Sequence, residues 1–419
     1  MIYYPIKYIS NLLINSVVAF LNIFIRRDKD IVLIGAWMGE KFTDNSRYLY
    51  QYLHYNKQSL KLNRVIWVTR NKALLAELQS KNYECYKMNS LKSLYFHLKS
   101  GVHIVCNVPH STKKYKGDIL GELSLGAKRI QLWHGIPLKG VGNTISTNSA
   151  IQATSNPIRK LSKSLKKFYL FKHLIHVSGG WDDFRLLSTS KDVSKRFERI
   201  FDISPNKIID SSYPRNCECL EYLQKEQEVL DRISSAEFTV LYLPTFREGN
   251  IKFAYPLDTE EINKLIDKHS ILWIEKPHSA DNNFGKRSNN LSKCTLLLES
   301  EFDINTIVPK VDLIITDYSS VSFDAIYYNK KVIYYIPDFD NYISNERGLS
   351  SGFDENTAGF MAKSIEKLSE SILYDYFNRK NSDDEEMKLQ SVKELVFDSK
   401  KAAYNQIIHD LELEDRKNN

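Results

Sequence analysis

The chain has 419 residues, 42% of them hydrophobic, which predicts two domains of roughly 150 to 200 residues each and not one core. The formal net charge of +7 is mild for a chain of this length. The five cysteines are odd in number and scattered, which argues against a disulfide framework and for a reducing compartment. Cys217 and Cys219 are too close together for the usual paired zinc ligands and have no second pair.

An apolar stretch at residues 2–25 opens the chain, interrupted by Pro5, Lys7 and three asparagines and ended by Arg26 and Arg27. It is long enough to span a bilayer but too polar for a spanning helix, and no small-residue cleavage site follows it. We therefore predict a helix that lies at a membrane interface by its apolar face. The alternative is a core helix packed on the first domain.

Short apolar runs then alternate with helical patterns. Strands are expected at residues 31–37, 64–69, 102–106 and 129–133, and helices at 45–55 and 72–80. Such alternation indicates parallel pairing in a doubly wound sheet.

Residues 123–181 contain no acidic side chain but nine basic ones: Lys128, Arg129, Lys139, Arg159, Lys160, Lys163, Lys166, Lys167 and Lys172. The positive electrostatic potential of such a segment would attract phosphate substrates or anionic lipid. Nucleic acid is not expected as a partner, because no helix-turn-helix, zinc-finger or aromatic RNA-binding signature is present. Within this segment, residues 156–174 have the spacing of a basic amphipathic helix, which predicts membrane-surface binding. A solvated helix packed on its own domain is the alternative.

The alternation restarts after a charged helical stretch at residues 220–233. Further strands are expected at residues 238–243, 270–274, 295–298, 313–316 and 331–336. The predicted fold is thus α/β, with two Rossmann-like domains facing a cleft where ligands bind beyond the carboxyl ends of strands. The expected boundaries are 1–28 for the membrane-associated helix, 29–222 and 223–395 for the domains, and 396–419 for a C-terminal helix and tail.

The first chemical motif lies where residues 129–133 run into His134 and Gly135, followed by Pro137 and Lys139. A lone histidine is more often structural than functional. Here the glycine and proline form a turn at a strand end, and imidazole can accept a hydroxyl proton near neutral pH. We therefore predict that His134 is a catalytic base.

Two more motifs end neighbouring strands of the second half. Thr245 and Arg247 follow Pro244, and arginine offers a fork of donors suited to phosphate oxygens. Lys276 and His278 end the next strand and could form a phosphate clamp, although a solvated loop would look similar.

The fourth motif runs from a buried strand through polar residues into a helix, and it comprises Thr316, Asp317, Ser319, Ser320 and Asp324. The serines and their amides are expected at a helix N-terminus, which favours an anion. Helix capping would explain the same residues, and the two roles are compatible.

These four motifs, in this order, resemble the CDP-glycerol glycerophosphotransferase family of teichoic acid and capsule polymer synthesis, over roughly residues 31–360. The resemblance implies a GT-B-like fold similar to that of nucleotide-dependent glycosyltransferases, and a CDP-alcohol donor held by the C-terminal half. It also implies monotopic association with the cytoplasmic leaflet. It assigns catalysis to His134 and donor-phosphate binding to Arg247, His278, Ser319 and Ser320.

The chain departs from the family pattern at several points. The proline that usually follows the histidine is replaced by Ser279, and Arg215 lies in a Gly-x-Pro-Arg-x-Asp-like segment whose two end residues are changed. Ala358 precedes Gly359 where the family has Pro-Gly. These changes leave the reaction class intact but put the donor alcohol in doubt.

The hypothesis from the sequence is transfer of a phosphoalcohol from a CDP-activated donor to a lipid-linked acceptor at a membrane surface, with no cofactor and no obligatory metal. One alternative is a glycosyltransferase of the same fold using a nucleotide sugar. Asp338 and Asp340 would suit a metal-dependent version, although loops are rich in aspartate. Another alternative is a non-catalytic membrane-bound assembly partner.

Overall fold

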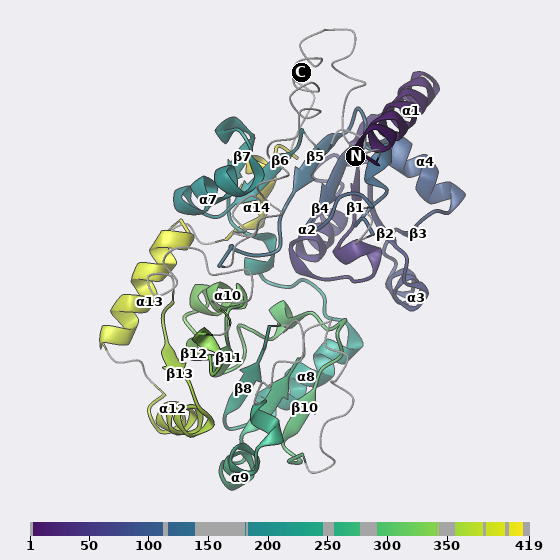
Figure 1. Cartoon of the computed structure of the whole chain (residues 1–419). Coiled ribbons are helices and arrows are strands. Elements are labelled where there is room, and N and C mark those ends of the chain that lie inside the picture. The colour runs from purple at the N-terminus through teal and green to yellow at the C-terminus, as the bar shows by residue number, and fades with distance from the viewer. Residues whose placement is uncertain are drawn as a thin grey trace.

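The computed structural model describes residues 3–111, 116–138, 181, 183–245, 255–276, 291–340, 342, 357–379, 383–398 and 402–413. Two parallel sheets, each with helices packed beside it, form two halves stacked one above the other (Figure 1). The predicted α/β class with two Rossmann-like halves is confirmed.

The first sheet has seven strands in the order β3-β2-β1-β4-β5-β6-β7. All its described pairings are parallel. Central strands are buried on both faces, as Val32, Leu33 and Ile34 show, and this explains their continuous apolar runs. The strands are β1 (Asp28–Ile34), β2 (Arg64–Thr69), β3 (Cys85–Lys87), β4 (Ser100–Val105), β5 (Lys128–Gln131), β6 (Arg185–Ser188) and β7 (Ile208–Asp210), and the helices include α2 (Asp44–Tyr55), α3 (Lys72–Ser80), α4 (Leu91–Lys99) and α7 (Lys191–Phe201).

Two predicted strands of this half end earlier than expected, and left-handed backbone follows each of them. The strand predicted to reach residue 37 stops at Ile34, and Trp37, Met38 and Gly39 in the 3-10 turn η1 (Trp37–Gly39) have φ values of 43°, 62° and 74°. The strand predicted to reach residue 133 stops at Gln131, and Trp133 has φ 61°.

The second sheet has six strands in the order β10-β9-β8-β11-β12-β13, again with parallel pairings. Ile315 pairs with Tyr242, and Tyr242 pairs with Glu275, so β8, β9 and β11 end together at one edge of the sheet. The strands are β8 (Thr239–Tyr242), β9 (Leu272–Glu275), β10 (Thr295–Leu297), β11 (Leu313–Thr316), β12 (Lys331–Tyr335) and β13 (Phe360–Ala362), with helices α8 (Gln224–Ser235), α9 (Glu260–His269), α10 (Val321–Tyr327) and α12 (Ile365–Phe377).

The C-terminal helices lead the chain back to the first half. Helix α13 (Asp383–Val396) contacts both α10 and α7, and α14 (Tyr404–Asp410) lies with the first sheet (Figure 1). The Tyr404 ring stacks on Tyr52 at a centroid distance of 4.4 Å. The chain therefore passes from the first half into the second and then returns, so two connections join the halves.

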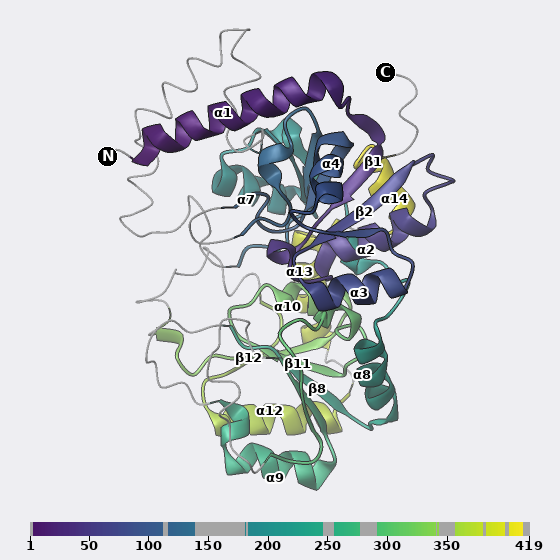
Figure 2. The ribbon, with the colours of Figure 1, turned by 90° about the vertical axis from the view of Figure 1, so that its right-hand side faces the viewer.

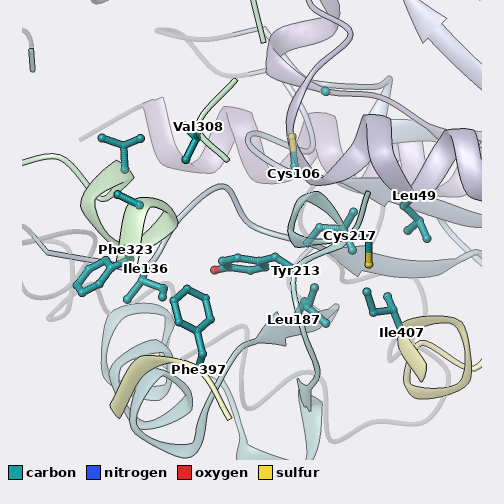
Figure 3. Close-up of a cluster of buried hydrophobic side chains, with 14 of the residues drawn as sticks. Leu49, Cys106, Ile136, Leu187, Tyr213, Cys217, Val308, Phe323, Phe397 and Ile407 are labelled. Atoms are coloured by element: carbon teal, nitrogen blue, oxygen red, sulfur yellow. The ribbon is translucent and has the colours of Figure 1, made fainter. Parts of the chain in front are cut away.

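One cluster of buried apolar side chains extends through both halves. Figure 3 shows part of it, with Ile136 and Tyr213 from the first half and Phe323 of α10 from the second. Ile136 lies within the predicted catalytic turn, between Gly135 and Pro137. The loop that carries His134 is thus fixed by apolar packing.

Helix α1 (Tyr3–Phe24) lies across the outer surface of the first half (Figure 2). The side turned toward the domain includes Asn15 and Val18, which are 0% and 1% exposed, and Asn22, whose amide donates to the Leu125 carbonyl oxygen at 3.0 Å. The opposite side exposes Leu13, Val17, Phe20 and Phe24, which share one face at spacings of four, three and four residues. The helix is therefore packed on the domain, as one alternative predicted, while its most apolar face remains uncovered.

None of the helices in the part of the chain that the structure describes combines the length and the apolar character needed to cross a membrane.

Candidate active site

A cavity of about 450 Å³ lies between the two halves, beyond the carboxyl ends of their strands. Its first wall comprises Trp37, Lys41, Thr43, Asp44 and residues 133–138. Its second wall comprises residues 243–245, Lys276, Ser300, Phe302, Ile304, Asn305, residues 318–321 and Asp324. Arg215, in the 3-10 turn η6 (Pro214–Asn216) that follows the first sheet, also lines the cavity. The structure thus brings His134, Gly135, Arg215, Thr245, Lys276, Ser319, Ser320 and Asp324 into one site.

His134 is half-buried between the rings of Trp37 and Trp133, at centroid distances of 5.5 and 4.4 Å. Its Nδ1 lies 3.1 Å from the carbonyl oxygen of Cys106. Because a carbonyl can only accept, Nδ1 must carry the proton, and Nε2 is left as the accepting nitrogen. Burial lowers the pKa of His134, and the charge of Asp44 partly opposes this shift. The imidazole is therefore neutral near pH 7, as a general base requires.

The backbone around His134 is strained and held by polar side chains. Trp133 adopts a left-handed conformation, while its N–H donates to Gln131 Oε1 at 3.1 Å and its carbonyl accepts from Asn45 Nδ2 at 2.9 Å. Left-handed backbone at a bulky residue costs energy and persists only where the surroundings fix it. The strain therefore coincides with the predicted catalytic turn.

Asp118 holds the two loops that support the imidazole. Its carboxylate accepts from the N–H of Met38 at 2.7 Å, and from those of Asn107 and Cys106 at 2.7 and 3.2 Å. Burial raises the pKa of Asp118 to about 7, although these backbone donors favour the ionised form. The Cys106 carbonyl that orients His134 is fixed by this arrangement.

Arg215 joins both walls of the cavity. Its guanidinium donates to Asp44 Oδ1 at 2.7 Å and to the His134 carbonyl oxygen at 3.0 Å from Nη1, and to Asp324 at 3.0 and 3.1 Å from Nε and Nη2. Burial alone would lower the pKa of Arg215, but the charges of Asp324 and Asp44 raise it above its ordinary value. Burial raises the pKa of Asp324 to about 6 despite this partner.

Gly135 permits a close approach of the two walls. A Cβ atom at this position would lie 2.5 Å from Ser320 Oγ, so any larger residue would displace the serine. Ser320 precedes α10 and makes no side-chain capping bond to it, and both Ser319 and Ser320 are half-buried at the cavity wall. Their hydroxyls lie directly across the cleft from the histidine turn.

Thr316 and Asp317 lie beneath the cavity and are not among the residues that line it. The Thr316 hydroxyl donates to the Leu243 carbonyl oxygen at 2.8 Å, and the Asp317 carboxylate accepts from the Thr245 N–H at 3.0 and 3.2 Å. These two side chains therefore tie the end of β11 to the loop after β8. They position Thr245, which does line the cavity.

Lys276 directly follows β9, and burial together with the nearby charge of Lys41 lowers its pKa to about 8.

The sequence did not predict Trp37, Lys41 and Asp44 as residues of the site. Their one detectable signal is their place after the first strand, at the same edge of the sheet as His134. Arg247, His278 and Lys139, and the basic segment 156–174, lie outside the described residues.

The described residues contain no group of three or more histidine, cysteine, aspartate or glutamate side chains arranged to hold a metal ion. Asp338, part of the Asp-x-Asp segment that would suit a metal-dependent enzyme, accepts a hydrogen bond from the Tyr318 hydroxyl at 3.1 Å.

A family model described as CDP-Glycerol:Poly(glycerophosphate) glycerophosphotransferase matches residues 17–409. The teichoic acid poly(glycerol phosphate) polymerase of Bacillus spizizenii is 24% identical over 359 residues, covering 83% of this chain and 84% of that protein. The teichoic acid glycerol-phosphate primase of Bacillus subtilis is 24% identical over 351 residues, covering 81% of each chain.

Among solved structures, the wall teichoic acid polymerase TagF soaked with CDPG superposes with a TM-score of 0.65 at 18% identity, covering 96% of this chain and 92% of that chain. At this identity the superposition establishes a shared fold.

Proposed function

The chain belongs to the CDP-glycerol:poly(glycerophosphate) glycerophosphotransferase family, and on that premise we propose that it transfers glycerol phosphate from CDP-glycerol to a hydroxyl of a lipid-linked cell-envelope polymer, releasing CMP. One observation carries the proposal. A neutral imidazole with an accepting Nε2 lies across a narrow cleft from two serines and a lysine, which suit a phosphate.

In the proposed reaction, the acceptor oxygen attacks the β-phosphorus of the donor while His134 Nε2 takes its proton. The new phosphorus–oxygen bond forms as the bond to the bridging oxygen breaks, and the electron pair leaves with CMP. Phosphoryl transfer depends mainly on positioning and charge neutralisation. Lys276, Ser319 and Ser320 supply these from the described wall, and the sequence adds Arg247 and His278.

Arg215 and Asp324 act as positioning groups in this proposal. Arg215 bonds the carbonyl of His134 and the carboxylate of Asp324 at once, so it couples the catalytic turn to the donor wall. Gly135 allows these walls to approach, and Thr245 is held at the same edge by Asp317.

We further propose that the protein binds the surface of an anionic membrane through α1, where lipid-linked acceptors are found. The exposed Leu13, Val17, Phe20 and Phe24 form one continuous apolar face. The opposite side faces the domain, where Val18 packs with Leu98 and Leu125 and Asn22 bonds the Leu125 carbonyl oxygen. A solvated surface helix turns polar side chains outward, so this exposed apolar face fits insertion into the headgroup region. The basic segment 156–174 would add electrostatic attraction.

Vesicle co-sedimentation tests the membrane proposal. Changing Leu13, Val17, Phe20 and Phe24 to serine should abolish most binding to anionic vesicles, and changing Lys160, Lys163, Lys166 and Lys167 to glutamate should weaken it, more so at low salt. Phe377→Ser is the matched control, because Phe377 is 69% exposed on α12, at the far end of the other half. Unchanged binding by the α1 variant would remove this helix from the proposal.

The reaction is tested by incubating the full chain with a lipid-linked acceptor and a panel of CDP-glycerol, CDP-ribitol and nucleotide sugars. Acceptor-dependent release of CMP from CDP-glycerol is expected. Release of a nucleoside diphosphate from a nucleotide sugar would instead identify a glycosyltransferase. Failure to bind any cytidine nucleotide would indicate an assembly partner without this activity.

A further inference from the structure

Two lysines from opposite halves line the same cavity. Lys41 lies in the loop between η1 and α2, and Lys276 directly follows β9. The Lys41 ammonium donates to the Ser300 carbonyl oxygen of the second half at 2.6 Å and lies 5.7 Å from the centroid of the Trp37 ring. Because Trp37 also packs against His134, Lys41 lies one side chain away from the catalytic turn.

The carboxylates nearest to this pair are bonded to other groups. Asp303 accepts from Asn305 at 2.8 and 3.1 Å and from Arg47 at 3.4 Å, and Glu301 accepts from the Ser300 hydroxyl at 2.5 Å. Among the described residues no ion pair joins Lys41 or Lys276 to a carboxylate, although the charges of Asp303 and Glu301 favour the protonated form of both lysines. Two ammonium groups thus share a cavity without a bound countercharge.

Such an arrangement is unfavourable until an anion enters. Burial lowers the pKa of both lysines, and the charge of Lys41 lowers that of Lys276 further. A phosphate between the two ammonium groups would reverse both effects, because an opposite charge favours the protonated form. The Lys41 bond to the neutral Ser300 carbonyl oxygen can be exchanged for a stronger bond to a phosphate oxygen, in which both partners are ionised.

We propose that Lys41 and Lys276 form a two-lysine phosphate subsite that holds one substrate phosphate from both halves of the molecule at once. This subsite rests on the proposed function, because that reaction supplies phosphate groups from two sources. One is the diphosphate of the donor and the other is the phosphodiester of the acceptor. The alternative is a structural role, in which the hydrogen bond from Lys41 to the Ser300 carbonyl oxygen only joins the halves and Lys41 takes no part in binding.

Two binding assays distinguish the sources. The variants are Lys41→Met, Lys276→Met and Lys41→Arg, with Lys264→Met as the matched control, since Lys264 is exposed on α9 and paired with Glu260. Calorimetry measures the affinities of CDP-glycerol and of cytidine. Initial rates measure the KM for a soluble glycerol phosphate dimer and for glycerol, which carries no phosphate.

If the phosphate is the donor's, both methionine variants should weaken CDP-glycerol binding about tenfold to a hundredfold and leave cytidine binding unchanged. If it is the acceptor's, CDP-glycerol binding should persist, while KM rises for the dimer and not for glycerol. Lys41→Arg should retain most of the affinity in either case. Binding at pH 8 should also take up protons in the parental chain and less in Lys276→Met, because the bound anion raises the lysine pKa.

A folded Lys41→Met chain with parental values in both assays would overturn the subsite, as would equal losses for cytidine and CDP-glycerol. A parental chain that neither binds CDP-glycerol nor releases CMP would overturn the proposed function itself. The two failures are therefore distinguishable.

Discussion

Two buried arginines join the halves of this molecule, and they differ in what else they touch. Arg47 on α2 is fully buried and donates to Glu226 at 2.5 and 2.7 Å and to Asp303 at 3.4 Å, with no part in the cavity wall. Arg215 makes a similar pair of bridges, to Asp44 and Asp324, but it lines the cavity and also bonds the His134 carbonyl. The same ion chemistry thus joins the halves in one place and, in the proposed function, positions the catalytic base in the other.

The largest expected effect is a loss of stability on substitution of Arg47. Arg47→Met leaves Glu226 and Asp303 buried without their countercharge, which should lower the free energy of unfolding by about 3 to 5 kcal/mol. Urea unfolding followed by circular dichroism measures the loss. The double variant Arg47→Met with Glu226→Leu should recover part of it, and Lys264→Met should leave the midpoint unchanged. A folded Arg47→Met chain with parental stability would contradict the structural role.

Arg215 should respond differently. Arg215→Lys keeps the charge but loses the fork that reaches Asp44, Asp324 and the His134 carbonyl together. We expect turnover to fall roughly tenfold to a hundredfold, since small misplacements of a catalytic group are costly. The loss of stability should be smaller than for Arg47→Met. Steady-state CMP release and urea unfolding, measured on both variants, check this contrast; a loss of stability with full turnover would make the two arginines equivalent.

The variant Gly135→Ala tests whether turnover requires the close contact between the two walls of the cavity. Gly135→Ala pushes Ser320 away from its present rotamer, and this should reduce turnover about twofold to tenfold, the equivalent of an off-rotamer side chain. Stability should change little, because the serine tip can rotate. Parental turnover in this variant would mean that the contact between Gly135 and Ser320 is incidental.

The smallest expected effect is on pH dependence. Because burial lowers the pKa of His134 below 6.5, the base stays deprotonated and the acid limb of kcat/KM should lie below pH 6.5. Asp44→Asn removes the charge that raises this pKa, so the limb should move to still lower pH, by less than about one unit. Glu260→Gln, on the exposed surface of α9, should leave the limb in place. If the acid limb of kcat/KM moves to higher pH in Asp44→Asn, the charge of Asp44 does not raise the pKa of the base as described.

Much of the fold could be predicted from the sequence, because parallel strands buried on both faces produce continuous apolar runs such as residues 313–316. The strands β3, β7 and β13 were not predicted, because three residues carry little pattern, and neither was the four-residue β6, in which only Leu186 and Leu187 are apolar. The left-handed turns at Met38 and Trp133 were missed because large side chains rarely adopt that conformation. Tertiary contacts impose it here.

The sequence could place residues at the cavity where a motif follows a strand, as with His134, Lys276 and Ser320, while their chemical roles stay predictions. Asp44 and Lys41 carry no motif of their own, and their partners Arg215 and Ser300 lie 171 and 259 positions away. Arg215 was recognised as a candidate, but its bonds to both walls depend on how the halves meet. Only the assembled cleft gives those residues their roles.

The most direct test of the account is single-turnover release of CMP from CDP-glycerol by His134→Gln. Glutamine keeps a polar group of similar reach but has no basicity near neutral pH. The account predicts a loss of roughly 10²-fold to 10⁴-fold in rate, the range for a positioned proton acceptor, with CDP-glycerol affinity unchanged because its phosphate contacts lie on the other wall. A folded His134→Gln chain that releases CMP at the parental rate would mean that the imidazole is structural and that the base lies elsewhere.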